Sequence, residues 1–298
     1  MEALTTLQIT IGIFTQLIPV WIAMGIILSI SVYYRPRLGL YGHLFDSRVG
    51  TMGLLLVLFW VLTAIFADLI ITHDPLAQIS GMKNKKIGFP VRGVEGTFYL
   101  LGGDNLARDI FSRVVMGSRS VLTIAPAATV FAFMVGITLG LPAGYKSGKL
   151  DTVLSFLSNL VLAFPVILLF FLLVTPEIRS TGVPIYLAAV LFLFPIILFV
   201  VLFQSRFYTQ PVKRNIYVAT VLVLGLWAYS GLAFNMDPLG VFYMEPNLLI
   251  IFVSVVFVTS PTVFRIVRCL TLYFTTRDYV YAAEPRREVS CYLMYSAV

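Results

Sequence analysis

Long apolar runs constrain this chain more than any other feature of its sequence. A run of roughly 20 apolar residues can cross a lipid bilayer as an α-helix, which pairs its backbone hydrogen-bonding groups internally. The sequence holds about seven such runs, at residues 9–32, 52–71, 121–143, 153–174, 185–203, 216–234 and 247–264. It therefore predicts an all-α fold, a polytopic bundle of transmembrane helices.

Composition excludes several other classes of protein. Hydrophobic residues make up 59% of the 298 residues and charged residues only 12%, which excludes an ordinary soluble domain. The formal net charge of +7 comes from Lys and Arg scattered among the connectors. They form no nucleic-acid motif, so we expect the chain to contact the lipid bilayer and no nucleic acid. The first run lacks a basic leader and a cleavage site, so we expect it to be retained as a span.

Residues that could carry chemistry are sparse. His43 and His73 stand apart from other metal ligands, and neither a phosphate-binding glycine loop nor a catalytic serine motif occurs. The sequence therefore predicts no catalytic residue, no metal site and no cofactor, and the chain is not expected to be an enzyme. Asp68 is the one carboxylate inside an apolar run, and it lies near enough to the end of that run to reach the headgroups.

Basic residues in short connectors predict the orientation, because such residues stay on the cytoplasmic side. They place the N-terminus outside and the C-terminal tail in the cytoplasm. Residues 72–119 are then external although they are rich in Lys and Arg, a departure that longer translocated segments tolerate. The connector residues assigned to the cytoplasm are Arg35, Arg37, Arg48, Lys146, Lys149, Arg206, Lys213 and Arg214.

The external segment at 72–119 is punctuated by glycines and is expected to be rich in loops. From residue 105 the pattern changes, because Leu106, Ile110 and Val114 recur every fourth residue. This spacing predicts a short amphipathic helix, capped by Asp104 or Asn105, that lies along the membrane surface. Such a helix either covers the bundle or has a function of its own, and both interpretations stay open.

Small residues recur every fourth position through the third run, at Ala128, Ala132, Gly136, Gly140 and Gly144. They fall on one helical face and let another helix approach closely, so we interpret them as a helix-packing surface. Three prolines inside or near the ends of apolar runs are expected to kink or shorten their helices; they are Pro165, Pro195 and Pro261.

Three stretches carry a resemblance to a known family. The first, at 101–121, contains the pattern Leu-Gly-Gly-Asp, Arg-Asp, Ser-Arg and Gly-Ser-Arg-Ser, and the second runs from the glycines at 136–144 through Gly148 and Asp151 to Ala163-Phe164-Pro165. The third is Phe264-Arg265-Ile266-Val267-Arg268, followed by Arg277-Asp278-Tyr279-Val280-Tyr281-Ala282-Ala283. In this order they resemble the inner-membrane permease subunits of the dipeptide, oligopeptide and nickel ABC importers. The first stretch matches the family motif at Asp104, Arg108, Asp109, Ser112, Arg113, Gly117 and Arg119.

The resemblance implies a function and a set of partners. It implies a permease subunit, in the bacterial inner membrane, of an ATP-driven importer for peptides or similar small solutes. A second permease would complete the translocation path, and an external solute-binding protein would deliver the solute. Separate cytoplasmic ATP-binding subunits would hydrolyse ATP and act on the third stretch, which resembles the approach to the family's Glu-Ala-Ala loop. The ATPase-coupling residues would be Arg277, Asp278, Tyr279, Ala282 and Ala283.

Departures from the family pattern suggest an alternative. Tyr281 stands in place of the motif's Glu, Pro285 interrupts the loop, and Arg287 stands where the family has Gly. The chain stops before the last family spans, and it carries an extra two-span insertion near 177–246. The alternative is thus a truncated, transport-inactive membrane scaffold. Either way we expect a single membrane domain over 1–298, with two spans at 1–71, the external segment at 72–119, further spans at 120–264 and an incomplete coupling segment at 265–298.

Overall fold

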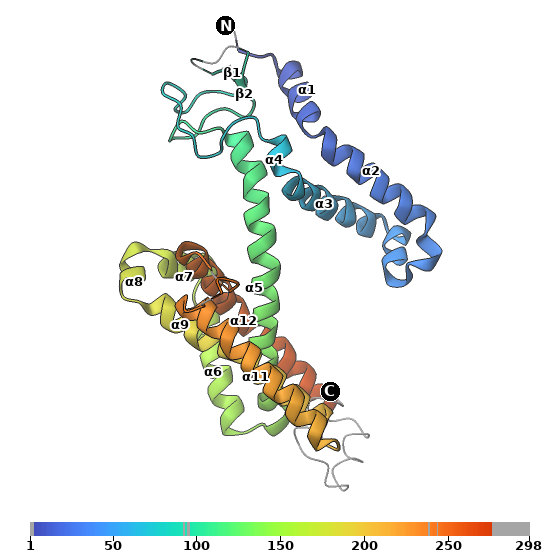
Figure 1. Ribbon diagram of the computed structural model, residues 1–298, viewed down its shortest axis with the longest axis vertical. Coiled ribbons are helices and arrows are strands. Elements are labelled where there is room, and N and C mark those ends of the chain that lie inside the picture. The colour runs from blue at the N-terminus through green and yellow to red at the C-terminus, as the bar shows by residue number, and fades with distance from the viewer. Residues whose placement is uncertain (1–2, 92, 94–95, 238, 243, 276–298) are drawn as a thin grey trace. The chain divides into compact units, whose positions relative to one another are not determined.

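The computed structural model describes residues 3–91, 93, 96–237, 239–242 and 244–275 (Figure 1). The all-α fold is confirmed, because the only strands among the described residues are β1 (Phe89–Pro90) and β2 (Phe98–Tyr99), which pair antiparallel. The chain forms two compact units, Met1–Thr123 and Ile124–Val298. The predicted domain divisions, including the two-span insertion, stay predictions.

The first unit is built from two helical segments and an irregular one. Helices α1 (Thr6–Gln16) and α2 (Ile18–Tyr33) meet at a bend of 56°. Pro19 lies in the first turn of α2 and has no amide hydrogen with which to continue α1. The turns η1 (Arg35–Arg37) and η2 (Gly39–Asp46) lead to α3 (Arg48–Ile65) and the short α4 (Ala67–Ile70). The hydrophobic core of the first unit contains Leu17, Val20, Leu62, Ala67, Ile70, Leu100, Phe111 and Val115.

The second unit gathers around its last helix. It contains the remainder of α5 (Ile110–Lys146), then α6 (Lys149–Ala163), α7 (Val166–Val174), α8 (Pro176–Ser180), α9 (Val183–Leu191), α10 (Leu193–Arg206), α11 (Pro211–Phe234) and α12 (Pro246–Thr275). In the most apolar 18-residue stretch of α12, 56% is buried, against 11% in the corresponding stretch of α11. Helix α12 is therefore the central helix of this unit, and α11 has most of its surface available to lipid.

The predicted apolar runs correspond to helices. Among the described residues, five helices are long and apolar enough to cross a membrane when α9 and α10 are taken together as one, and the number rises to seven if each of two bent pairs counts as one span. One bent pair is α1 and α2. The other is α6 and α7, which meet at 86° where Phe164 is extended in front of Pro165, because a residue before proline avoids the helical region. Pro261 does not shorten its helix, since α12 continues through it.

The predicted short helix at the membrane surface is wrong. Residues 105–109 are not helical, and Ile110 and Val114 belong to α5, one uninterrupted helix of 37 residues (Figure 1). Ala107 has φ +63°, a left-handed conformation that a right-handed helix cannot include. Helix α5 therefore starts after this residue and runs directly into the third predicted span.

Candidate functional site

A buried carboxylate begins α5. Asp109 is fully buried, and its carboxylate accepts hydrogen bonds from the backbone amides of Phe111 at 3.3 Å and Ser112 at 3.1 Å. These amides belong to the first helical turn, where no backbone carbonyl is available to them, so Asp109 is the N-cap of α5. Neither Asp104 nor Asn105, the predicted caps, has this position.

Asp109 also binds the segment that follows α4. The hydroxyl of Ser112 donates to Asp109 Oδ2 at 2.6 Å, and the hydroxyl of Thr72 donates to the same oxygen at 3.0 Å. The amides of Thr72 and His73 each donate to Ser112 Oγ at 3.1 Å. We call Thr72, His73, Asp109 and Ser112 the Asp109 cluster. It joins the chain after the second span to the start of α5.

The hydrogen bonds decide the charge of this cluster. Burial alone would raise the pKa of Asp109, but the nearby His73 imidazole and hydrogen bonds from Ser112 and Thr72 outweigh it and hold that pKa below its usual range. The carboxylate is therefore ionised at neutral pH although water does not reach it. His73 Nδ1 lies 3.7 Å from Asp109 Oδ2, and within the described residues its buried Nε2 has no hydrogen-bond partner.

A second acidic residue organises the turn before α5. Asp104 accepts hydrogen bonds from the amides of Leu106 at 2.8 Å and Arg108 at 2.9 Å, and it forms ion pairs with the side chains of Arg108 and Arg113. Burial alone would raise the pKa of Asp104, but the two amides and the Arg108 side chain lower it to about 2. Gly102 precedes this turn with φ +83°, and a Cβ there would lie 2.5 Å from the carbonyl oxygen of Lys85. Glycine is required there because of both restrictions.

The motif ends at Arg119, which reaches back to the second span. Its guanidinium pairs with Asp68 at 2.9 Å and donates to the carbonyl of Ala64 at 3.2 Å. The sequence had placed Asp68 near the headgroups, and the structure adds this partner. Gly117 makes no comparable contact; it lies with Val57 and Trp60 around an apolar cavity of about 480 Å³. Six of the seven motif residues thus form polar contacts within the first unit.

The small residues of α5 face α12. A Cβ built on Gly136 would lie 2.5 Å from Val263 Cγ1, one on Gly140 would lie 2.9 Å from Val267 Cβ, and one on Gly144 would lie 2.6 Å from Thr271 Cβ. Ala128 and Ala132 are buried on the same helix. Backbones that approach this closely leave no room for a larger side chain.

An ion pair joins α6 to α12 next to this contact. Arg268 donates to both carboxylate oxygens of Asp151, with a distance of 2.5 Å from Nη2 to Oδ2. Ser155, one turn further along α6, donates to Asp151 at 3.1 Å. Asp151 and Arg268 are 117 positions apart in the sequence, and nothing in the local pattern of residues predicts that they pair. A two-pronged guanidinium contact fixes orientation as well as distance.

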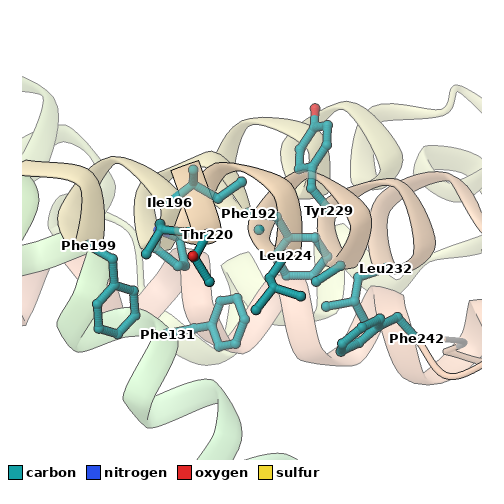
Figure 2. Close-up of a pocket in the computed structure, with 13 residues that line it drawn as sticks. Phe131, Phe192, Ile196, Phe199, Thr220, Leu224, Tyr229, Leu232 and Phe242 are labelled. Atoms are coloured by element: carbon teal, nitrogen blue, oxygen red, sulfur yellow. The ribbon is translucent and has the colours of Figure 1, made fainter. Parts of the chain in front are cut away.

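A cavity of about 350 Å³ lies among α5, α10 and α11, with Phe192 at the junction of α9 and α10 also in its lining (Figure 2). Phe131, Phe199, Leu224 and other apolar side chains surround it. The hydroxyl of Thr220, one of the few polar groups in the lining, donates to the carbonyl of Ile216 in its own helix. The cavity therefore offers an apolar surface.

The predicted coupling residues lie outside the described residues. These are Arg277, Asp278, Tyr279, Ala282 and Ala283. Sequence reasoning also missed Thr72, His73 and the pairing of Asp151 with Arg268. An isolated His in a turn was the one signal available for the first two.

The chain is similar in sequence to proteins named as peptide-transport permeases. It is 32% identical over 142 residues to the di/tripeptide transport system permease protein of Pseudomonas aeruginosa, covering 47% of this chain and 46% of that one. It is 33% identical over 131 residues to the dipeptide transport system permease protein of Alkalihalophilus pseudofirmus, covering 43% and 40%. A glutathione transport system permease protein of Pectobacterium atrosepticum is 45% identical over 69 residues, 23% of each chain.

These matches confirm the resemblance over a part of the chain. The chain spans less than half the length of the curated relatives it matches. No family model matches it, and no solved structure was found to be similar.

Proposed function

We propose that this chain, similar in sequence to peptide-transport permeases, is a transmembrane permease subunit of an ATP-driven importer for peptides or similar small solutes. The observation that carries the proposal is the similarity to relatives named as dipeptide and di/tripeptide permeases, over 131 and 142 residues. The five to seven apolar helices within the described residues fit a multi-pass protein. The bacterial cytoplasmic membrane is the proposed location.

A second permease is part of the proposal because of the chemistry of the cavities. The cavities of about 350 and 480 Å³ are lined almost entirely by apolar side chains. A peptide carries charged ends and backbone polar groups, which are costly to bury in such surroundings. A path for this solute needs polar surface, which we assign to the interface with the second permease. An external solute-binding protein and cytoplasmic ATP-binding subunits complete the proposed assembly.

Coupling to the ATP-binding subunits is proposed to pass through α12. The glycines of α5 contact α12, and Asp151 joins α6 to it. Helix α12 leads in sequence to residues 277–283, the proposed contact with the ATPase. Because the three helices are joined by close backbone contact and by an ion pair, a displacement of 277–283 would move them together. This supports Arg277, Asp278, Tyr279, Ala282 and Ala283 as coupling residues.

Peptide uptake tests the proposal directly. The chain is expressed with the second permease, ATP-binding subunits and solute-binding protein of its genome of origin, in cells that lack peptide importers, and uptake of labelled Ala-Ala is measured. We expect uptake that requires the chain and ATP. Uptake that is the same with and without the chain, while the chain is in the membrane, would refute the function. Copurification of partners without uptake would favour the transport-inactive scaffold.

The ion pair provides a test of coupling within the same assay. Asp151→Asn and Arg268→Gln are each expected to reduce uptake, and exchanging the two charges in a double variant is expected to restore part of it. Asp46→Asn is the matched control, because Asp46 forms an exposed pair with Arg35 in the first unit. Equal uptake in all four variants would reject the role of the pair.

The proposed orientation has its own test. The N-terminus is proposed to lie outside and residues 207–210, between α10 and α11, in the cytoplasm. A cysteine introduced at Gln210 should react with a membrane-impermeant maleimide only after the cells are opened, in a background where Cys269 and Cys291 are serine. Labelling of this cysteine in intact cells would show that the orientation is the opposite of the proposed one.

A further inference from the structure

The end of the α10–α11 hairpin has the composition of a membrane interface. Phe203 and Phe207 of this hairpin stack on Tyr217, with ring centroids 5.4 and 4.8 Å away. Tyrosine is one of the aromatic residues that gather at the level of the lipid headgroups. Two basic residues, Arg206 and Lys213, lie at the same end, exposed to the surroundings.

The charges at this end are not neutralised within the described part of the chain. None of the salt bridges there includes Arg206, Lys213 or Arg214. Among the described residues, the side chain of Arg214 donates a hydrogen bond of 3.4 Å to its neighbour Asn215. Three cations between residues 206 and 214 therefore offer their hydrogen-bond donors to an anion.

The basic residues are continuous with the cavity of Figure 2. Arg206 follows Phe199 and Pro195 by seven and eleven residues, which is about two and three helical turns, so the three share one face of α10. Lys213 precedes Thr220 and Leu224 by the same two intervals and shares their face of α11. Both helices thus lead from a basic end to an apolar cavity.

The near part of the cavity is within reach of one lipid chain. At 1.5 Å per residue, Phe199 and Thr220 lie about 10 Å along the helices from the basic residues, and Leu224 about 16 Å. One leaflet of the hydrocarbon core is about 15 Å thick, half of the whole. Phe199, Thr220 and Leu224 are also exposed, so the cavity is open where these three side chains line it.

We propose that this face binds an anionic phospholipid. Its phosphate pairs with Arg206, Lys213 and Arg214, and one acyl chain lies against Phe199 and Thr220 in the near part of the cavity. Charge complementarity selects the headgroup, because three basic side chains face no acidic partner in the described chain. The apolar lining selects the acyl chain, because nearly all of the lining is hydrocarbon and the Thr220 hydroxyl already donates within its own helix. The site does not depend on the transport function.

Lipid binding by the full-length chain tests the proposal. The protein is purified in neutral detergent, and native mass spectrometry measures its binding of dioleoylphosphatidylglycerol and of dioleoylphosphatidylcholine, which has the same chains but no net charge. We expect at least about tenfold tighter binding of the anionic lipid, since each basic residue near an anionic headgroup is worth about fivefold. Equal binding of the two lipids would overturn the proposal.

Matched variants separate the headgroup from the chain. Lys213→Gln is expected to weaken binding of the anionic lipid about fivefold, whereas Lys149→Gln, which removes an exposed charge from another helix end, is expected to leave it unchanged. Thr220→Phe fills the near part of the cavity and should weaken the binding of both lipids, while Val223→Phe, on the exposed surface of the same helix and outside the cavity lining, should not. Equal effects within either pair would overturn the site.

The same spectra decide between a lipid and other occupants. Competition of inorganic phosphate with the anionic lipid at similar concentration would show a soluble-anion site, and it would overturn the proposal. A dimer that is lost in Thr220→Phe would show that a second copy covers the face, which would overturn it too. Lys213→Gln changes an exposed side chain and keeps the test valid if the cavity variant fails to fold.

Discussion

Replacing Gly144 by alanine tests the contact between α5 and α12. The new methyl group would lie 2.6 Å from Thr271 Cβ and 2.9 Å from the carbonyl oxygen of Arg268. Carbon atoms in contact are normally about 3.5–4.0 Å apart. One of the two close atoms belongs to the backbone of α12, so a change of rotamer cannot relieve the overlap. The helices must separate by about 1 Å locally if contact distances are to become normal.

The expected free-energy change combines two opposing effects. Overpacking of this kind costs about 1–3 kcal/mol. Alanine in a helix interior is favoured over glycine by about 0.8–1.0 kcal/mol. We therefore expect the free energy of unfolding to fall by about 0–2 kcal/mol in Gly144→Ala. The matched control is a variant that gains the same helix propensity without the overlap.

Gly53→Ala is that control. Gly53 lies inside α3, and a Cβ there meets nothing within 4 Å, so it gains helix propensity without overlap. We expect this variant to be more stable than the unchanged protein by about 0.5–1 kcal/mol. The two variants should thus differ by about 1–3 kcal/mol, measured by reversible unfolding in mixed micelles of a mild detergent and SDS. Stabilisation of Gly144→Ala equal to that of Gly53→Ala would refute the close contact.

Three further predictions concern polar groups outside the spans. Asp109→Ala removes the acceptor of the buried Ser112 hydroxyl and amide, so the free energy of unfolding should fall by about 1–3 kcal/mol. Chemical denaturation in detergent measures this change. A free energy of unfolding that stays the same within error would reject Asp109 as the cap. Asp104 has a folded pKa of about 2, below its ordinary 3.8, so its contribution to stability is present above pH 4 and is lost as the pH falls toward 2. The melting temperature of the unchanged protein should therefore approach that of Asp104→Asn over this interval, and a constant difference would contradict the assignment. Asp237 accepts hydrogen bonds from the indole of Trp227 at 2.8 Å and from the amides of the turn that follows. Asp237→Ala should therefore speed proteolysis of residues 235–245 and shift tryptophan fluorescence to longer wavelength. An unchanged rate of cleavage would count against this role of Asp237.

Much of the helical architecture was predictable from local sequence. An apolar run of about 20 residues has few alternatives to a helix in lipid, because unpaired backbone groups are costly there. The bend at Pro165 was predictable for a similar reason, since proline restricts the residue before it. The start of α5 was not, because the apolar spacing of Leu106, Ile110 and Val114 continues across the point where Ala107 turns left-handed.

The candidate site was predictable only in part. The resemblance singled out Asp104, Arg108, Asp109 and the residues after them, but their contacts were not visible in the sequence. Thr72 and His73 meet Asp109 about 37 positions away in the chain. No period of a helix or strand relates residues at that distance, so only the folded chain could pair them.

The sequence by itself determined that the chain is a set of apolar helices with basic connectors, because these properties depend on residues close together in the chain. Tertiary structure decided which helices meet. The glycines at 136, 140 and 144 showed that some helix could approach α5, and the fold showed that α12 does so. Likewise, Asp151 and Arg268 are two ordinary charges until α6 and α12 lie side by side, when each becomes the partner that permits the other's partial burial.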